Sequence, residues 1–286
     1  MVIDVGGVPL YAIDQGDGEP PLLLLAGVAG QCADWASTLA LLAGRPRAVG
    51  YDRPGLGGSP PSSAFPTLDG EVARVGAVAA RFGLQRPILV AHSAAAFFAE
   101  AYARCHPTAV AGLVLVDPSV EFRTRPRGRL GSLAARRAAR IGAAVAHGAD
   151  LSPLPRLAGP AIWRAAAASM TWRGRPPDDA ARLYRRASVA ATAYTEWLAY
   201  RDWAADLARL RRRTQAPAVP TVVLTALGRI RGDRGRRRWR AAHARLTAMF
   251  PDGWQIVLPD SGHLVGFDRP DAIADAVGAV IDHART

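Results

Sequence analysis

The sequence predicts an α/β protein with a mainly parallel sheet and one helical insertion. The chain has 286 residues, half of them hydrophobic, which is enough to bury one sizeable core. Short apolar runs alternate with segments of helical periodicity in the first half of the chain and again near its end, and this alternation favours parallel strands joined by crossover helices. Residues 121–216, between these two parts, contain almost no strand pattern.

Each expected strand is a short apolar run, and each expected helix has an apolar face. The run at 21–26 is continuous, as in a strand buried on both faces. The segment 67–82 places Leu68, Val72 and Val75 on one side of a helix. The expected strands are 8–13, 21–26, 48–51, 87–91, 112–116, 220–226 and 254–258, and the expected helices are 33–43, 67–82, 94–105, 236–250 and 270–283.

The segment 121–216 is rich in alanine and arginine and contains scattered prolines and the tryptophans Trp163, Trp172, Trp197 and Trp203. Its composition predicts helices. The sequence therefore predicts a core made of residues 1–120 and 217–286, interrupted by a helical insertion at 121–216.

The net charge of +12 is unevenly distributed along the chain. All 36 basic residues are arginines, and residues 121–240 hold 26 of them against 8 acidic residues. Solvated helix faces explain such a segment more simply than an anion-binding surface does. No nucleic-acid-binding motif accompanies the charge, so we expect no nucleic-acid partner.

The cysteine content and the apolar runs bear on cofactors and location. Cys32 and Cys105 are the two cysteines, and they lack the spacing of metal ligands. We therefore expect no metal and no cofactor. We also expect no signal peptide, no membrane span and a reducing, cytoplasmic location.

Ser93 is the candidate nucleophile. It lies between an expected buried strand and an expected helix, in the stretch ILVAHSAAAFF that begins at Ile88. A nucleophile elbow needs small residues two positions before and after the serine, because the turn is tight. Ala91 and Ala95 occupy the positions where glycine is usual. The N-terminus of the following helix favours negative charge near the hydroxyl group.

Five stretches, in the same order and at similar spacing, make the chain resemble the α/β-hydrolase superfamily. They are LLLLAGVAG (22–30), YDRPGLGGS (51–59), VAHSAAA (90–96), LVLVDPS (113–119) and PDSGHLVGFDRPDAI (259–273). The first resembles the family's oxyanion segment, although Ala26 replaces the usual histidine. The resemblance implies an α/β-hydrolase fold, with a mainly parallel eight-stranded sheet flanked by helices and a helical cap between strands six and seven.

The resemblance also implies roles for individual residues. His263 matches the catalytic base, because it follows a strand in the loop that carries the family's histidine. The backbone N–H groups of Val28 and Ala94 match the oxyanion hole, and Gly27 and His92 are expected to border the substrate. We expect the remaining histidines to be surface or helix residues; they are His106, His147, His243 and His283.

Two residues are candidates for the acid that orients His263. The family's acid usually follows the seventh strand, where the first carboxylate is Asp233, among arginines. Asp117 directly follows the sixth strand, where some members carry the acid. We favour Asp117 because it lies at the sheet edge where Ser93 and His263 are expected. Asp260 is expected to point away from His263.

These residues predict a serine hydrolase that cleaves a small-molecule ester, or a related acyl bond, through an acyl-enzyme intermediate. The alternative is a small-molecule-binding protein on the same fold with little or no catalytic activity, because the elbow lacks its glycines and fold alone does not give function. We expect the insertion to cover Ser93, with some of its tryptophans lining the pocket. Substrate identity and oligomeric state do not follow from the sequence.

Overall fold

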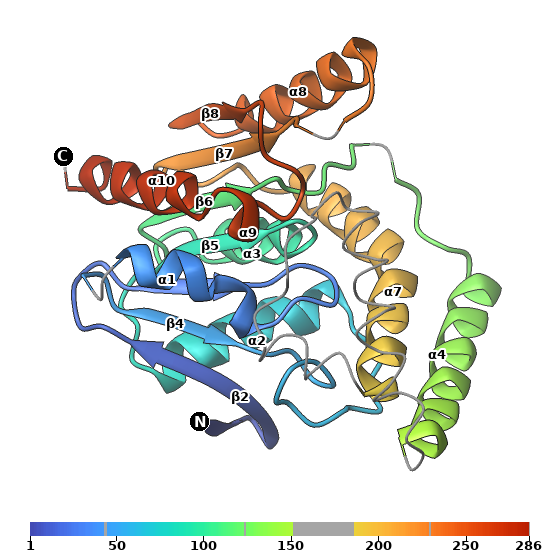
Figure 1. Cartoon of the computed structure of the whole chain (residues 1–286). Coiled ribbons are helices and arrows are strands. Elements are labelled where there is room, and N and C mark those ends of the chain that lie inside the picture. Colours follow the sequence, from blue (N-terminus) through green and yellow to red (C-terminus); the bar gives the residue numbers. More distant parts are fainter. Residues whose placement is uncertain (43–44, 123, 151–185, 229, 286) are drawn as a thin grey trace.

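The computed structural model describes residues 1–42, 45–122, 124–150, 186–228 and 230–285. Eight strands form one sheet in the order β1-β2-β4-β3-β5-β6-β7-β8 (Figure 1). The strands are β1 (Val2–Val5), β2 (Val8–Gln15), β3 (Leu22–Leu25), β4 (Ala48–Tyr51), β5 (Ile88–His92), β6 (Gly112–Val116), β7 (Thr221–Ala226) and β8 (Gly253–Leu258). β2 is antiparallel to both β1 and β4, and the other neighbouring strands are parallel.

The expected strands are present within two residues of their predicted bounds, but β1 was missed. β1 and β2 form a hairpin whose loop is Gly6 and Gly7, with φ values of 63° and 82°. Two adjacent glycines at positive φ are typical of a tight hairpin turn. The stretch VIDVGGVPLY, at residues 2–11, therefore indicates a hairpin.

Helices cover both faces of the sheet. They are α1 (Ala36–Leu42), α2 (Leu68–Arg81), α3 (Ala95–Cys105), α4 (Arg129–Asp150), α7 (Ala187–Arg211), α8 (Asp233–Thr247), α9 (Val265–Asp268) and α10 (Pro270–His283), and a short 3₁₀ helix spans Cys32–Trp35. α2, α3 and α8 pack on one face of the sheet, and α1 and α10 pack on the other. α8 begins three residues before the expected helix 236–250 and ends three residues before its end.

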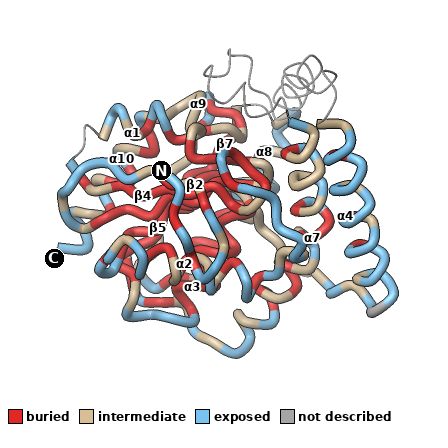
Figure 2. Tube along the Cα trace, turned by 90° about the horizontal axis from the view of Figure 1, so that it is seen from below, coloured by how far each residue is buried: buried red, intermediate tan, exposed pale blue. Residues whose placement is uncertain are grey.

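The central strands divide their side chains between two cores because successive residues of a strand point to opposite faces. Leu23 and Leu89 belong to the core under α2 and α3, whereas Leu22 and Ile88 belong to the core under α1 and α10. All four side chains are fully buried. Figure 2 shows the buried strands between the two helical layers.

The described parts of the expected insertion contain α4 and α7, which pack against each other. Trp203 of α7 is buried against Phe98 of α3, with ring centroids 4.9 Å apart. Trp197 is 65 % exposed. These two tryptophans are thus a core residue and a surface residue, and Trp163 and Trp172 lie outside the described residues. The boundaries of the insertion stay a prediction.

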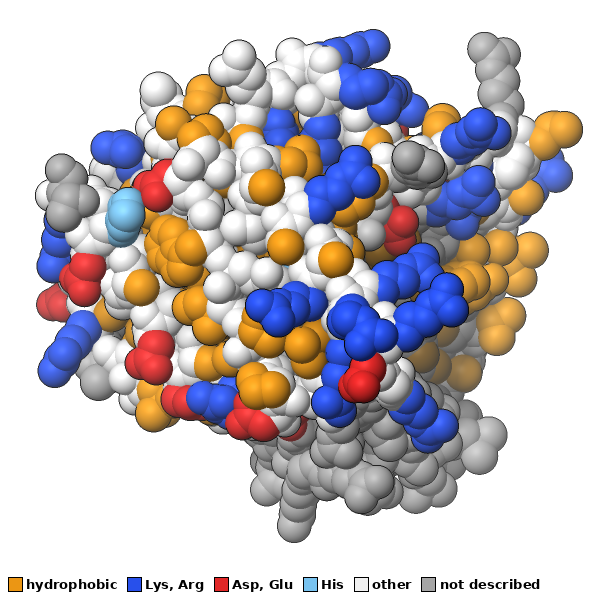
Figure 3. Space-filling view, turned by 90° about the horizontal axis from the view of Figure 1, so that it is seen from above, with side chains coloured by type: hydrophobic (Ala, Val, Ile, Leu, Met, Phe, Trp, Pro, Cys, Tyr) orange, Lys and Arg blue, Asp and Glu red, His pale blue; other side chains and the backbone are white. Residues whose placement is uncertain are grey.

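The arginines of α8 are mostly exposed; they are Arg234, Arg236, Arg237, Arg238, Arg240 and Arg245. On the face shown in Figure 3, arginine side chains lie singly and in small groups between hydrophobic and uncharged ones. This distribution fits solvated helix faces. No described helix is both long enough and apolar enough to cross a membrane.

Candidate active site

Ser93 lies in the sharp turn between β5 and α3, and its φ is 55°. A non-glycine residue rarely adopts such a left-handed conformation, so the surrounding structure must hold it. The Ser93 N–H donates to the carbonyl of Val116 at 3.0 Å, and the Ser93 carbonyl accepts from the N–H of Ser119 at 3.0 Å. Both bonds tie the turn to the end of β6. Ala91 and Ala95 are fully buried on either side.

Gly27 lies directly against this turn. A Cβ atom built on Gly27 would lie 3.0 Å from the Cβ of Ser93 and 3.0 Å from Nδ1 of His92. No side chain fits there without displacing one of the two. Gly27 therefore allows the loop after β3 to approach the serine, and its own contribution is backbone rather than side chain.

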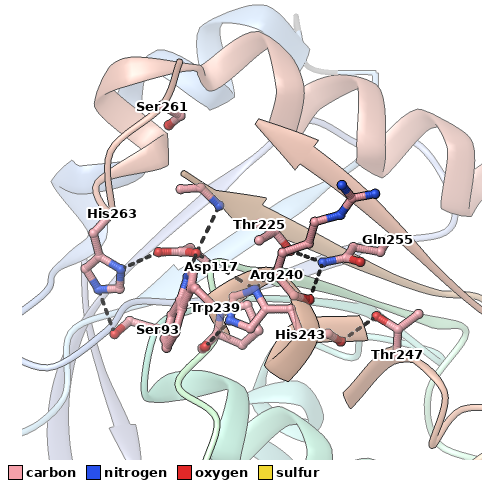
Figure 4. A network of polar contacts seen from close by, with 12 residues as sticks. Ser93, Asp117, Thr225, Trp239, Arg240, His243, Thr247, Gln255, Ser261 and His263 are labelled. Atoms are coloured by element: carbon pink, nitrogen blue, oxygen red, sulfur yellow. Dashed lines mark hydrogen bonds and ion pairs between the residues drawn. The ribbon is translucent and has the colours of Figure 1, made fainter. Parts of the chain in front are cut away.

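His263 links Ser93 to Asp117 (Figure 4). His263 Nε2 lies 3.0 Å from the Oγ of Ser93, and its Nδ1 lies 2.7 Å from Oδ2 of Asp117. A carboxylate can only accept, so Nδ1 carries the hydrogen and Nε2 is left to accept from the serine hydroxyl. The imidazole is 29 % exposed and the carboxylate 4 %, so the chain of bonds runs from a nearly buried anion towards the surface.

The second oxygen of Asp117 is also occupied. Asp117 Oδ1 accepts from the backbone N–H of Ala226 and from Nε1 of Trp239, each at 3.0 Å. Asp117 has a φ of 39°. These two donors and His263 fix a buried carboxylate that follows β6 without a gap.

Trp239 and His243 of α8 complete the surroundings of Asp117, and the sequence interpretation missed both. They lie four residues apart and so share one helix face. His243 is fully buried, Nε2 donates to the carbonyl of Pro118, and Nδ1 accepts from Thr225. Burial lowers the pKa of His243, which keeps it uncharged. Its apolar neighbours on α8 could have suggested a buried face.

The other carboxylates considered for this role lie elsewhere. Asp233 is the exposed first residue of α8, where a negative charge suits the helix N-terminus. Asp260 pairs with Arg269 at 3.0 Å. His263 instead bonds Asp117, the carboxylate that directly follows β6.

Val28 and Ala94 lie on the two loops beside Ser93. Ala94 directly follows the serine and is the N-cap residue of α3, so its N–H points out of the helix start. Among the described residues, no hydrogen bond from the N–H of Val28 or Ala94 is found. Both donors remain free for a ligand oxygen.

His92 contacts the loop of His263. Its Nε2 lies 2.8 Å from the carbonyl oxygen of His263, and the two rings are 4.8 Å apart. Burial, followed by the charge that His263 can carry, lowers the pKa of His92 to about 4. The neutral ring therefore donates from Nε2 to that carbonyl.

The cavity that His92 borders has a volume of about 30 Å³ and is also lined by Asp34 and Trp35. That volume suits about one water molecule and is too small for an ester. The expectation that His92 borders the substrate finds no support in this cavity. Burial raises the pKa of Asp34 to about 7.

A larger cavity, of about 600 Å³, lies between the loop 61–67, α4 and α7. Arg53 and Glu196 form part of its wall, and neither Ser93 nor His263 does.

In the part of the chain that the structure describes, no group of three or more histidine, cysteine or acidic side chains could hold a metal ion.

The chain belongs to the alpha/beta hydrolase family, because a sequence model of that family matches residues 22–276. The matched region begins at β3 and ends within α10, so it includes every residue of the site described above. A search of curated proteins gave no significant match.

Several solved structures share the fold. A thermophilic esterase from Thermogutta terrifontis (malate bound) has a TM-score of 0.69 at 21 % identity, covering 100 % of this chain and 97 % of the other. E-2-(acetamidomethylene)succinate hydrolase gives 0.69 at 18 %, covering 99 % and 98 %. The epoxide hydrolase CorEH gives 0.71 at 16 %, also covering 99 % and 98 %. At these identities the likeness concerns the fold.

Proposed function

We propose that this protein is a serine hydrolase that cleaves a small-molecule ester, or a related acyl bond, through an acyl-enzyme intermediate. The observation that carries the proposal is the continuous hydrogen-bonded chain from Ser93 through His263 to Asp117. In this arrangement each group has one task. Ser93 is the nucleophile, His263 the general base and Asp117 the acid that orients the base.

The first half-reaction follows from these distances. Ser93 Oγ attacks the carbonyl carbon while its proton moves to His263 Nε2, 3.0 Å away. The imidazolium that forms is stabilised by the carboxylate at Nδ1. His263 then returns the proton to the leaving alcohol, and the acyl group stays on Ser93.

The N–H groups of Val28 and Ala94 are assigned to the oxyanion of the tetrahedral intermediate. Both lie next to the nucleophile, and backbone donors held in place need no reorganisation as charge develops. In the second half-reaction, His263 removes a proton from water as the water attacks the acyl carbon, and then returns that proton to Ser93 Oγ as the acyl–oxygen bond breaks and the acid leaves. The scheme requires no metal and no cofactor.

A serine at the elbow separates this proposal from epoxide hydrolysis, the activity named for one of the structural neighbours. An epoxide has no acyl group from which an acyl-serine could form. The esterase among the neighbours is compatible with the proposed chemistry. Three hydrogen bonds fix the Asp117 carboxylate, and one of them orients the imidazole of His263. A protein that only bound a ligand would not need an oriented imidazole, so this arrangement supports catalysis over passive binding.

Covalent labelling tests the proposal. A fluorophosphonate should label the protein at Ser93, and a panel of p-nitrophenyl esters of increasing acyl length should give turnover with the wild type. The Ser93→Ala variant should lose both the label and, by a factor on the order of 10⁴ to 10⁶, the turnover. A folded wild-type protein that neither labels nor turns over any ester would instead indicate a non-catalytic binding protein.

A further inference from the structure

A buried ion pair lies behind the loop that carries the Val28 N–H. Arg53, in the loop after β4, bonds Glu196 of α7 through Nε to Oε1 at 2.6 Å and through Nη2 to Oε2 at 2.9 Å. Both side chains are about 5 % exposed or less. Burying two charges is costly unless further hydrogen bonds satisfy them, so the remaining partners of this pair matter.

Those partners are all backbone groups of the loop after β3. Arg53 donates to the carbonyl of Ala26 at 2.5 Å and to that of Gly27 at 2.6 Å. Glu196 Oε2 accepts from the N–H of Ala29 at 2.9 Å. The pair thus holds three peptide groups in succession, on both sides of Val28.

The bond to Gly27 determines the direction of the Val28 N–H. The carbonyl of Gly27 and the N–H of Val28 belong to the same peptide group, which is planar and trans, so the two point in opposite directions. Arg53 fixes the carbonyl on its own side. The Val28 N–H must then point away from Arg53, and Gly27 lies in contact range of Ser93.

The bond to Ala29 removes a competing donor. The next N–H along the loop is directed to Glu196, although Ala29 has a φ of 60° and thus a strained backbone. Holding this peptide limits rotation of the whole loop. It also leaves Val28, rather than Ala29, as the donor from this loop.

We infer that Arg53 and Glu196 are positioning residues that orient the Val28 N–H towards the oxyanion, so that α7 helps to form the oxyanion hole. This inference rests on the proposed function. Neither residue touches the substrate in this scheme. They act through the backbone of the loop after β3, and their effect belongs to the transition state rather than to substrate binding.

The chain offers a matched control. Glu100 of α3 is also buried and bonds Arg104 at 2.8 Å and Arg211 of α7 at 2.6 Å. This second network joins α7 to the core as the first does. It has no hydrogen bond to residues 26–30 among the described contacts. If Arg53 and Glu196 only stabilised the fold, variants in the two networks should therefore have similar effects on kcat.

The test compares Glu196→Gln and Arg53→Lys with Glu100→Gln and Arg211→Lys. Arg53 Nε and the Ala29 N–H donate to different oxygens of Glu196, and Glu196→Gln replaces one of these acceptors with an NH2 donor, so it cannot satisfy both donors in place. A lysine at 53 keeps the charge but cannot reach both carbonyls and Glu196 at once. Each variant is measured for thermal stability, for kcat and KM on a p-nitrophenyl ester, and for inhibition by phenylboronic acid, whose serine adduct resembles the tetrahedral intermediate.

We expect Glu196→Gln and Arg53→Lys to lower kcat by a factor on the order of 10², the scale for one oxyanion donor. Affinity for the boronic acid should fall with kcat, while KM changes less than about threefold. The two control variants should lose stability but keep kcat within about threefold of wild type. If the control variants lose as much kcat and boronic-acid affinity as Glu196→Gln and Arg53→Lys do, the inference is wrong.

A double variant, Arg53→Met with Glu196→Met, covers the case in which a single variant does not fold, because it leaves no unpaired buried charge. Its folded form should show the same loss of kcat and of boronic-acid affinity, and wild-type values would overturn the inference. An inactive, unlabelled wild-type protein would overturn the proposed function and this inference together. Active wild type with unaffected variants would overturn the inference alone.

Discussion

A hydrogen bond joins the side chain of His92 to the backbone of His263: Nε2 of His92 lies 2.8 Å from the carbonyl oxygen of His263. The residue before Ser93 therefore helps to fix the loop that carries His263. The two residues are 171 positions apart, so this bond, together with the one between His263 and Ser93, connects the end of β5 to the loop before α9.

The first prediction concerns stability against pH. The pKa of His92 is lowered to about 4 in the folded protein, first by burial and then by His263, whereas an unfolded histidine titrates near 6.5. Between these values the unfolded chain binds the proton more readily. The contribution of His92 is therefore complete above pH about 6.5 and is lost as the pH falls towards 4, by at most about 3 kcal/mol.

Urea unfolding at pH 4.5 and pH 7 measures this loss. The His92→Leu variant should show a smaller difference between the two pH values than wild type does. His106→Gln, at the exposed end of α3, serves as the control and should keep the wild-type difference. Equal pH dependence in His92→Leu and wild type would contradict the prediction.

A second prediction concerns the backbone strain at Ser93. Because its φ is 55°, glycine should fit the turn better than alanine, and Ser93→Gly should be more stable than Ser93→Ala by about 1 kcal/mol. Both variants lack the Ser93 hydroxyl group, so the comparison isolates the effect of the backbone conformation. Ser132 of α4 provides the opposite case, where alanine should be the more stable by about 1 kcal/mol. Chemical denaturation of Ser93→Gly, Ser93→Ala, Ser132→Gly and Ser132→Ala measures these differences in the free energy of unfolding.

Third, the two candidate acids should behave differently. Asp117→Asn keeps the size of the side chain but presents the wrong group to His263 Nδ1, so kcat should fall by about 10² to 10⁴. Asp233→Asn, at the exposed start of α8, should change kcat little. Steady-state kinetics of both folded variants test this assignment. A severe loss in Asp233→Asn would return Asp117 to a purely structural role.

The fourth prediction uses the close approach of Gly27. An added Cβ would lie 3.0 Å from both the Ser93 Cβ and His92 Nδ1. Gly27→Ala should therefore destabilise the fold by about 1 to 3 kcal/mol and reduce kcat by at least about tenfold, because the nucleophile must move. Gly278→Ala in α10, where nothing lies within 4 Å of the new atom, should be neutral or stabilising. Wild-type kcat in Gly27→Ala would show that the turn can adapt.

Much of the sheet could be predicted because buried parallel strands are short, continuous and apolar. Leu22–Leu25 and Gly112–Val116 stand out for this reason. The neighbourhood of Ser93, Asp117 and His263 was also predictable, since residues that follow parallel strands gather at one edge of the sheet. The hairpin of β1 and β2 was missed although Gly6 and Gly7 marked its turn.

The Arg53–Glu196 pair could not be predicted from local pattern. The two residues are 143 positions apart, and each looks like an ordinary charged residue in its own segment. Glu196 belongs to a helix with little amphipathic contrast, in which burial depends on what α7 packs against. The apolar neighbours of His243 on α8 indicate a buried face, but the hydrogen-bond partners of Trp239 and His243 could not be predicted, because Asp117, Pro118 and Thr225 lie on other elements.

The strand order has a consequence for biosynthesis. Ser93 and Asp117 follow β5 and β6 in the middle of the sheet, but His263 comes after β8, which pairs at the outer edge beside β7. His263 lies 170 residues after Ser93, so a ribosome makes the strand before the serine well before it makes this histidine. In the proposed mechanism, Ser93 therefore has no base until β8 has paired with β7 and the loop that carries His263 has reached it.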